Sequence, residues 1–147
     1  MNSKNKVPDI SYYRLSLTDF LKESHPELLI DNAFITARSE LAAEIYSQAV
    51  RNGSNQIEAG EQANAVLFED LHFSIHNTLT NILWNEFSDL IPEEDAKPWA
   101  ILLFPECEHV FAEYTLSDDF AYEPEYESLY TELTGVIANY FEEHGIQ

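Results

Sequence analysis

The stretch Pro124–Gly145, "PEYESLYTELTGVIANYFEEHG", decides the fold class because its apolar and aromatic residues recur at helical spacing. They form one stripe, made of Tyr126, Leu129, Tyr130, Leu133, Ile137, Tyr140 and Phe141. Pro124 suits the first turn of a helix, where its missing N–H would have no intrahelical partner, and Gly145 suits a helix stop. The stretch therefore predicts a long helix from about Glu125 to His144 that buries one face.

The segments before it have the same periodicity and are bounded by capping residues, glycine or proline. They predict helices over about 13–24, 31–51, 54–71, 74–90 and 92–114. Pro98 and Pro105 fall inside the last of these, so we expect the fifth helical segment to be broken or kinked. No stretch alternates with a period of two for long enough to predict a sheet. The sequence thus predicts an all-α, compact single-domain bundle of about six helices.

Length and composition agree with one folded domain. The chain has 147 residues, and a domain of this size buries roughly two thirds of the surface that its unfolded chain exposes. Hydrophobic residues make up 45% of the chain, which is too much apolar surface for a disordered protein despite the formal net charge of −20. We therefore expect residues 1–11 to form an N-terminal tail and residues 12–147 to form a single all-α domain around one core.

The charge of the chain is unevenly distributed. Six of its seven lysine and arginine residues lie within the first 51 positions, and only Lys97 follows them. Nucleic acids and anionic membranes owe much of their affinity for proteins to lysine and arginine, so we expect no direct binding to either. A basic protein partner fits the acidic region, and solubility alone is the competing explanation.

Several classes of function lack their sequence signals. No apolar run reaches the roughly 20 residues that span a bilayer, and residues 1–9 are not followed by the apolar segment of a signal peptide. Cys107 is the only cysteine, which excludes an internal disulfide and predicts a small core residue. Glycine-rich phosphate loops are missing, so we predict no cofactor. These features together predict a cytoplasmic protein and make an enzyme the less favoured reading.

The stretch "LSDDFAYEPEYESLYTELTG" at 116–135 contains no lysine or arginine to neutralise its carboxylates. We select five of them as candidate partner-binding residues: Asp118, Asp119, Glu123, Glu125 and Glu127. An EF-hand calcium loop would need a central glycine, which is missing here. A mimic of nucleic acid would need carboxylates arrayed along one face. The remaining reading is a solvated helix start, where the helix dipole favours carboxylates.

Two Glu-x-x-His motifs, Glu69 with His72 and Glu106 with His109, have the spacing that carboxylate-bridged di-metal bundles use. Both glutamates lie opposite the apolar stripe of their segments, whereas metal ligands in a bundle core must point inward. His72 and His76 are four residues apart and could share a metal if both lay on one helix, but a predicted helix cap separates them. We predict no metal site, with His72 and His76 as the alternative ligands.

Two charged residues fall inside apolar stripes. Arg38 lies among Phe34, Leu41 and Ile45, and Glu86 lies between neighbouring apolar positions of the 74–90 segment. Because a buried unpaired charge is costly, we predict that the two residues are buried and pair with each other or with other opposite charges. Arg38→Ala would then cost roughly 3–5 kcal/mol of stability. A polar cavity for a small ligand around this pair is the alternative reading.

Stretches along nearly the whole chain carry a family resemblance: "SYYRLSLTDFLKESHPELL", "LAAEIYSQAVRNG", "ANAVLFEDLHFS", "LWNEF" and "LSDDFAYEPEYESLYTELTG". From about Tyr12 to Gly145 the chain resembles a family of short acidic bacterial proteins, the domain of unknown function numbered eighteen ninety-six. The resemblance implies a compact, mainly helical domain and an association with genomes rich in conjugative elements. It implies no catalytic residues.

The function is unknown from sequence, and two hypotheses remain. The first is a non-enzymatic, acidic interaction or accessory module that meets a basic protein partner and is linked to a mobile element. The second is a small-ligand or metal-binding helical bundle, which could be an enzyme. The sequence leaves formation of a homodimer open.

Overall fold

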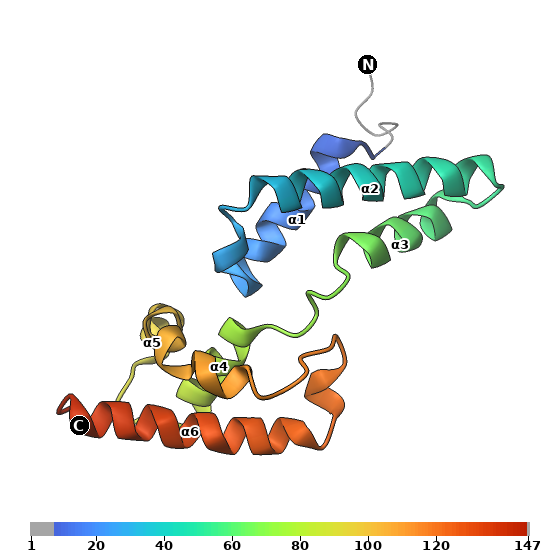
Figure 1. The fold of residues 1–147 in the computed structure, drawn as a ribbon. Coiled ribbons are helices and arrows are strands. Elements are labelled where there is room, and N and C mark those ends of the chain that lie inside the picture. Colours follow the sequence, from blue (N-terminus) through green and yellow to red (C-terminus); the bar gives the residue numbers. More distant parts are fainter. Residues whose placement is uncertain (1–7, 147) are drawn as a thin grey trace. The chain divides into compact units, whose positions relative to one another are not determined.

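The computed structural model describes residues 8–146, and all regular secondary structure in that range is helical (Figure 1). The contacts divide the chain into two compact units, the first ending at Leu71 and the second beginning at His72. Each unit has its own hydrophobic core, so the expectation of one core is wrong. The cores are separate because each helix packs mainly on helices that are near it in sequence. The single domain at residues 12–147 stays a prediction.

The first unit is a three-helix arrangement in which side chains cap the start of every helix. Its elements are α1 (Ile10–Ser24), the 3₁₀ turn η2 (Pro26–Leu28), α2 (Asn32–Arg51) and α3 (Gln56–Leu67). Asp9, Asp31 and Asn55 each accept a backbone N–H of the following helix, which satisfies donors that have no intrahelical partner. The predicted tail at residues 1–11 is too long, because α1 begins at Ile10; residues 1–7 lie outside the described part.

The buried face of α2 is turned by about one residue from the predicted stripe. Ile35, Ser39, Ala42, Tyr46 and Ala49 are buried, whereas Leu41, which was predicted to point inward, is 48% exposed. The inner face of a helix lying between two neighbours is set by both contacts, and α2 packs on α1 and on α3. The rotation moves Arg38 from the predicted centre of the stripe to its edge.

The second unit packs three helices against one another. Its elements are α4 (Ile75–Glu86), the 3₁₀ turn η3 (Glu93–Asp95), α5 (Ala96–Phe111), the 3₁₀ turn η4 (Phe120–Tyr122) and α6 (Glu125–Glu143). The long C-terminal helix is confirmed, with Leu129, Leu133, Ile137 and Phe141 buried on one stripe. The tyrosines on the same stripe are half-buried at its edges.

The prolines do not break α5. The helix is continuous from Ala96 to Phe111 with Pro105 inside it, so the predicted division into two short helices is wrong, and a kink stays a prediction. Pro98 sits in the first turn, where no intrahelical donor is lost. Pro105 forfeits one backbone hydrogen bond, and burial of Leu103 and Cys107 on either side of it offsets that cost.

Candidate functional site

The acidic segment between α5 and α6 is anchored by a buried aromatic side chain. Phe120, in η4, is 1% exposed, and its ring meets those of Phe73 and Tyr114 edge-on at centroid distances of 5.2 and 5.7 Å. Two residues later, Tyr122 is 89% exposed. The segment therefore combines a fixed point in the core with a tip that faces solvent.

Four of the five predicted partner-binding residues are exposed: Asp119, Glu123, Glu125 and Glu127. Asp118 is half-buried, and its Oδ1 accepts the backbone N–H of His72 at 3.1 Å. Glu125 and Glu127 lie in the first turn of α6, where the helix dipole stabilises carboxylates. Asp118 thus has a structural contact, and Glu123 accepts the hydroxyl of Ser117 at 3.4 Å. We use the name η4 acidic surface for the exposed carboxylates of residues 119–127, which are Asp119, Glu123, Glu125 and Glu127.

The two units differ strongly in charge. The first unit has six basic and eleven acidic residues, a formal net charge of −5, whereas the second has one basic and sixteen acidic residues, a net charge of −15. Because of this charge, the electrostatic potential of the second unit, which carries the η4 acidic surface, favours cationic ligands.

Within residues 8–146, every helix is too short or too polar to span a bilayer.

A second feature of the acidic unit is a pair of hollows that share Trp84 and Glu93. One, of about 430 Å³, is lined by Trp84, Ser88, Ile91 and Glu93, and the other, of about 380 Å³, by Trp84, Glu93, Glu94 and Lys97. The indole N–H of Trp84 donates to the backbone oxygen of Glu93 at 3.2 Å, which orients a ring that is 40% exposed. We call these hollows the Trp84 groove. An indole face beside carboxylates suits a cationic side chain.

The sequence predictions missed the Trp84 groove. A signal was available, because Trp84 lies away from the α4 stripe of Leu79, Ile82 and Leu83 and precedes the acidic run at 93–95. The sequence did not show that the loop after α4 brings Glu93 back into contact with Trp84.

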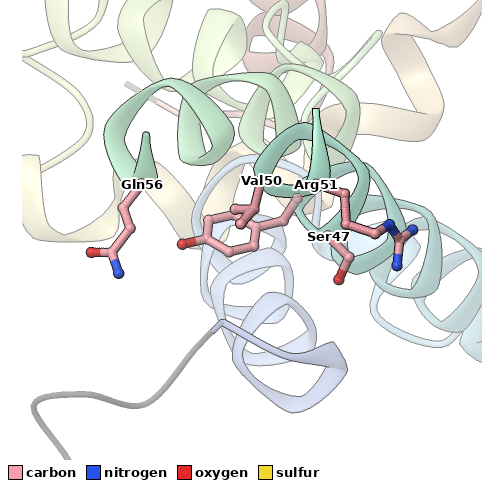
Figure 2. Close-up of a pocket in the computed structure, with 5 residues that line it drawn as sticks. Ser47, Val50, Arg51 and Gln56 are labelled. Carbon is pink, nitrogen blue, oxygen red and sulfur yellow. The ribbon is translucent and has the colours of Figure 1, made fainter. Parts of the chain in front are cut away.

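The first unit has a hollow of about 310 Å³ where α2 ends and α3 begins (Figure 2). Tyr46, Ser47, Val50, Arg51 and Gln56 line it. Figure 2 shows the side chains of Gln56 and Arg51 extending to opposite sides of the hollow. Arg51 also lies 3.5 Å from a carboxylate oxygen of Glu44 on its own helix. Small-ligand sites place a few polar groups so that they converge on one point, and this hollow does not.

Arg38 is half-buried and caps the end of α3. Its Nη1 donates to the backbone oxygens of Val66, Leu67 and Glu69, at 3.2, 3.2 and 2.7 Å. The guanidinium also lies 4.8 Å from the ring centroid of Phe34. Carbonyl oxygens at a helix C-terminus carry partial negative charge, so the predicted opposite charge is supplied by the dipole of α3, not by a carboxylate.

Glu86 was predicted to be a buried charge, and that prediction is wrong. The residue is exposed, and one of its carboxylate oxygens accepts the hydroxyl of Tyr130 at 2.9 Å. Glu86 lies on the inner side of α4, but it is the last helical residue and so lies past the edge of the core. A pair of Arg38 with Glu86 is therefore not needed to satisfy either charge.

The histidines of the metal hypothesis are separated as predicted. Ser74 caps α4 by accepting the N–H of Asn77, so His72 precedes the helix and His76 lies inside it. His72 is exposed, whereas His76 is buried and stacks on Phe104 at 5.3 Å. Within residues 8–146, no three His, Cys, Asp or Glu side chains lie close enough together to hold a metal ion.

Glu69, Glu106 and His109 are exposed, so they do not point into a bundle core. Cys107 is buried in the core of the second unit, as predicted. Its burial, and secondarily the charge of Glu106, raise the pKa of the thiol to about 11. A thiol with so high a pKa is a poor nucleophile at neutral pH.

His25 ties the end of α1 to the end of the first unit. Its Nε2 donates to the backbone oxygen of Leu71 at 2.7 Å, and its Nδ1 lies 3.5 Å from a carboxylate oxygen of Glu27. Burial alone would lower the pKa of this histidine, but the hydrogen bonds to Glu27 and Leu71 and the charge of Glu27 outweigh it, so the pKa is raised.

We expect His25 to make the stability of the protein depend on pH. A raised pKa in the folded state means that the stabilisation is fully present below the unfolded pKa of about 6.5 and is lost as the pH rises through the folded value. The wild type should therefore have a higher free energy of unfolding than His25→Gln, and this difference should be larger below pH 6.5 than above pH 8. Urea unfolding of both proteins across this range measures the gap. A difference between the two proteins that is the same at every pH would contradict the prediction. Glu27→Gln removes a carboxylate that raises the pKa of His25, so the stability of this variant should depend less on pH.

Comparison with known proteins shows the family and the fold of the chain. A family model described as a domain of unknown function (DUF1896) matches residues 5–146. The chain belongs to this family. A crystal structure of protein PG0816 from Porphyromonas gingivalis has the same fold, with a TM-score of 0.89 and 41% identity over 95% of each chain. A search of curated proteins found no match. The family carries no assigned activity.

Proposed function

We propose that this member of the DUF1896 family is a non-enzymatic acidic module that binds a basic protein partner in the cytoplasm. The observation that carries the proposal is the η4 acidic surface, whose exposed carboxylates belong to a unit with a formal net charge of −15. Buried Phe120 fixes the segment that presents them. A surface fixed before binding loses little conformational entropy when a partner docks.

Electrostatics favours a protein partner over nucleic acid. The phosphates of a nucleic acid would be repelled by the second unit, because binding to them requires lysine and arginine and this unit contains only Lys97. A basic protein meets the same surface with opposite charge and gains in association rate from it. The link to a mobile element belongs to this proposal and is supported by the family resemblance alone.

A charge-neutralised variant tests the proposal. We would change Asp119→Asn, Glu125→Gln and Glu127→Gln together, leaving Asp118 because it accepts the N–H of His72. The control neutralises one aspartate and two glutamates of the first unit, Asp19→Asn, Glu40→Gln and Glu61→Gln, all exposed. Binding of an oligolysine peptide is measured by isothermal titration calorimetry at low and high salt.

We expect the η4 variant to bind about tenfold more weakly, which is a loss of about 1.4 kcal/mol of binding free energy. The control variant should lose less than half of that free energy. Added salt should weaken binding to the wild type, since exposed charges are screened over about 10 Å at 0.1 M. Equal losses in both variants would show that net charge alone attracts the peptide, and the η4 acidic surface would then not be the site.

A further inference from the structure

Helix α5 presents apolar side chains on two opposite faces. Its inner face contributes Ala100, Leu103, Cys107 and Val110 to the core. The outer face carries Pro98, Ile101, Leu102 and Pro105, all exposed, with Ile101 and Leu102 each 55% accessible. Single exposed apolar residues are normal, but these four have the spacing i, i+3, i+4, i+7 and form a continuous stripe. We call them the α5 stripe.

Acidic groups lie on both sides of the α5 stripe, and the exposed basic residues on the same outer side of the helix are Lys97 before it and His109 after it. On the helical wheel, Glu108 lies just beyond Ile101 and Glu106 just beyond Leu102, and both are exposed. The N-terminal end of the stripe meets the Trp84 groove, because Lys97, which lines that groove, lies one turn before Ile101. Glu93 and Glu94 outnumber Lys97 in this groove, so its net charge is negative.

We propose that the α5 stripe is the docking site of a cationic amphipathic helix supplied by the basic partner. An amphipathic helix lays its apolar face on a partner's apolar surface through residues at the same i, i+3, i+4, i+7 spacing. Its lysine or arginine residues then meet Glu106 and Glu108 along the edges. One more basic side chain enters the Trp84 groove, where the indole face and the carboxylates of Glu93 and Glu94 receive it.

Charge selects this occupant over a second copy of the chain. Two copies meeting through α5 would bring two units of net charge −15 together, and like charges oppose such a contact. A cationic helix instead neutralises these groups while it covers the apolar side chains. This inference rests on the proposed function and adds the chemistry of the partner's binding segment.

Three synthetic peptides of about four helical turns test the proposal on the full chain. The first is an amphipathic helix of leucine and lysine, the second replaces every leucine with serine at unchanged charge, and the third replaces every lysine with glutamate. Binding is followed by fluorescence anisotropy of labelled peptide. The variant is Ile101→Ser with Leu102→Ser, and the control is Leu15→Ser with Leu41→Ser, which removes two exposed apolar side chains of the first unit.

We expect the leucine–lysine peptide to bind the wild type and the control alike, and the α5 variant at least about tenfold more weakly, a loss of about 1.4 kcal/mol. The double variant Glu106→Gln with Glu108→Gln should also bind the leucine–lysine peptide more weakly. The leucine–glutamate peptide should not bind the wild type. Circular dichroism checks that each variant stays folded, which is expected because the altered residues are exposed.

The outcomes separate this inference from the proposed function. If the serine–lysine peptide binds as tightly as the leucine–lysine peptide, the acidic unit attracts cations but the α5 stripe is not the docking site. Only this inference then fails. If neither peptide binds, both proposals fail. If sedimentation shows a dimer that the α5 variant dissociates, the occupant is a second copy and the proposal is overturned.

Discussion

Phe120→Ala is expected to lower the free energy of unfolding by about 3–5 kcal/mol, the usual cost of removing a buried phenylalanine ring. The ring is 1% exposed and packs edge-on against Phe73 and Tyr114, so its removal leaves a cavity that neighbouring side chains fill only partly. The loss should be large even though Phe120 lies in a short 3₁₀ turn between helices, where substitutions are usually tolerated.

Tyr122→Ala provides the matched control, because it removes an aromatic ring from the same turn. Tyr122 is 89% exposed, and its replacement should change stability by less than about 0.5 kcal/mol. Urea unfolding followed by circular dichroism and by tryptophan fluorescence measures both variants, and Trp84 and Trp99 both report on the second unit. Similar losses for the two variants would contradict the assignment of Phe120 as the anchor.

The same variant links stability to the proposed function. If Phe120 fixes the η4 acidic surface, Phe120→Ala should weaken oligolysine binding even under conditions where the protein remains folded, because the carboxylates would have to be ordered on binding. Tyr122→Ala keeps the anchor, so its effect on binding reports only the direct contact made by the tyrosine.

Arg38→Met is expected to destabilise the protein by about 1.5–3 kcal/mol, the range for hydrogen bonds that involve a charged group. Methionine keeps the apolar stem of the side chain but leaves the oxygens of Val66, Leu67 and Glu69 without their donor. This loss is smaller than the 3–5 kcal/mol expected for breaking a buried ion pair, because Arg38 is only half-buried and its partners are neutral carbonyls.

Arg51→Met is the control for the removal of an arginine from the same helix. Arg51 forms an exposed pair with Glu44 at 3.5 Å, with both side chains more than half accessible, so its loss should cost less than about 1 kcal/mol. Urea unfolding of the two variants side by side gives the comparison. A cost for Arg38→Met no larger than that for Arg51→Met would show that the contact with the end of α3 contributes little.

The sequence was a good guide wherever a local signal decided the outcome. The helix starts predicted near residues 31, 54 and 74 are confirmed, and the side chains that cap them in the structure are Asp31, Asn55 and Ser74. The stripe from Leu129 to Phe141 faces the core because a helix of that periodicity has only one apolar face. A cap depends on residues a few positions apart, whereas the face that a helix buries also depends on its neighbours, as the rotation of α2 shows.

The errors share a different cause. Arg38 and Glu86 both lie near apolar stripes, yet one reaches the carbonyls of α3 and the other lies past the end of the α4 core. The uninterrupted course of α5 through Pro105 depends on burial of residues on both sides of the proline. In each case the outcome depends on where a helix ends or on what packs against it, which local sequence signals do not fix.

By itself the sequence determined the helical class, the approximate helix starts, the acidic balance and the absence of glycine-rich or multi-cysteine sites, since each follows from composition or short-range spacing. Only the tertiary structure decided that two cores form, which charges are satisfied by helix ends, and that Trp84 meets Glu93 and Glu94 in one groove. The physical reason is that burial and charge pairing depend on which surfaces meet, and helical periodicity fixes only the face that each helix offers.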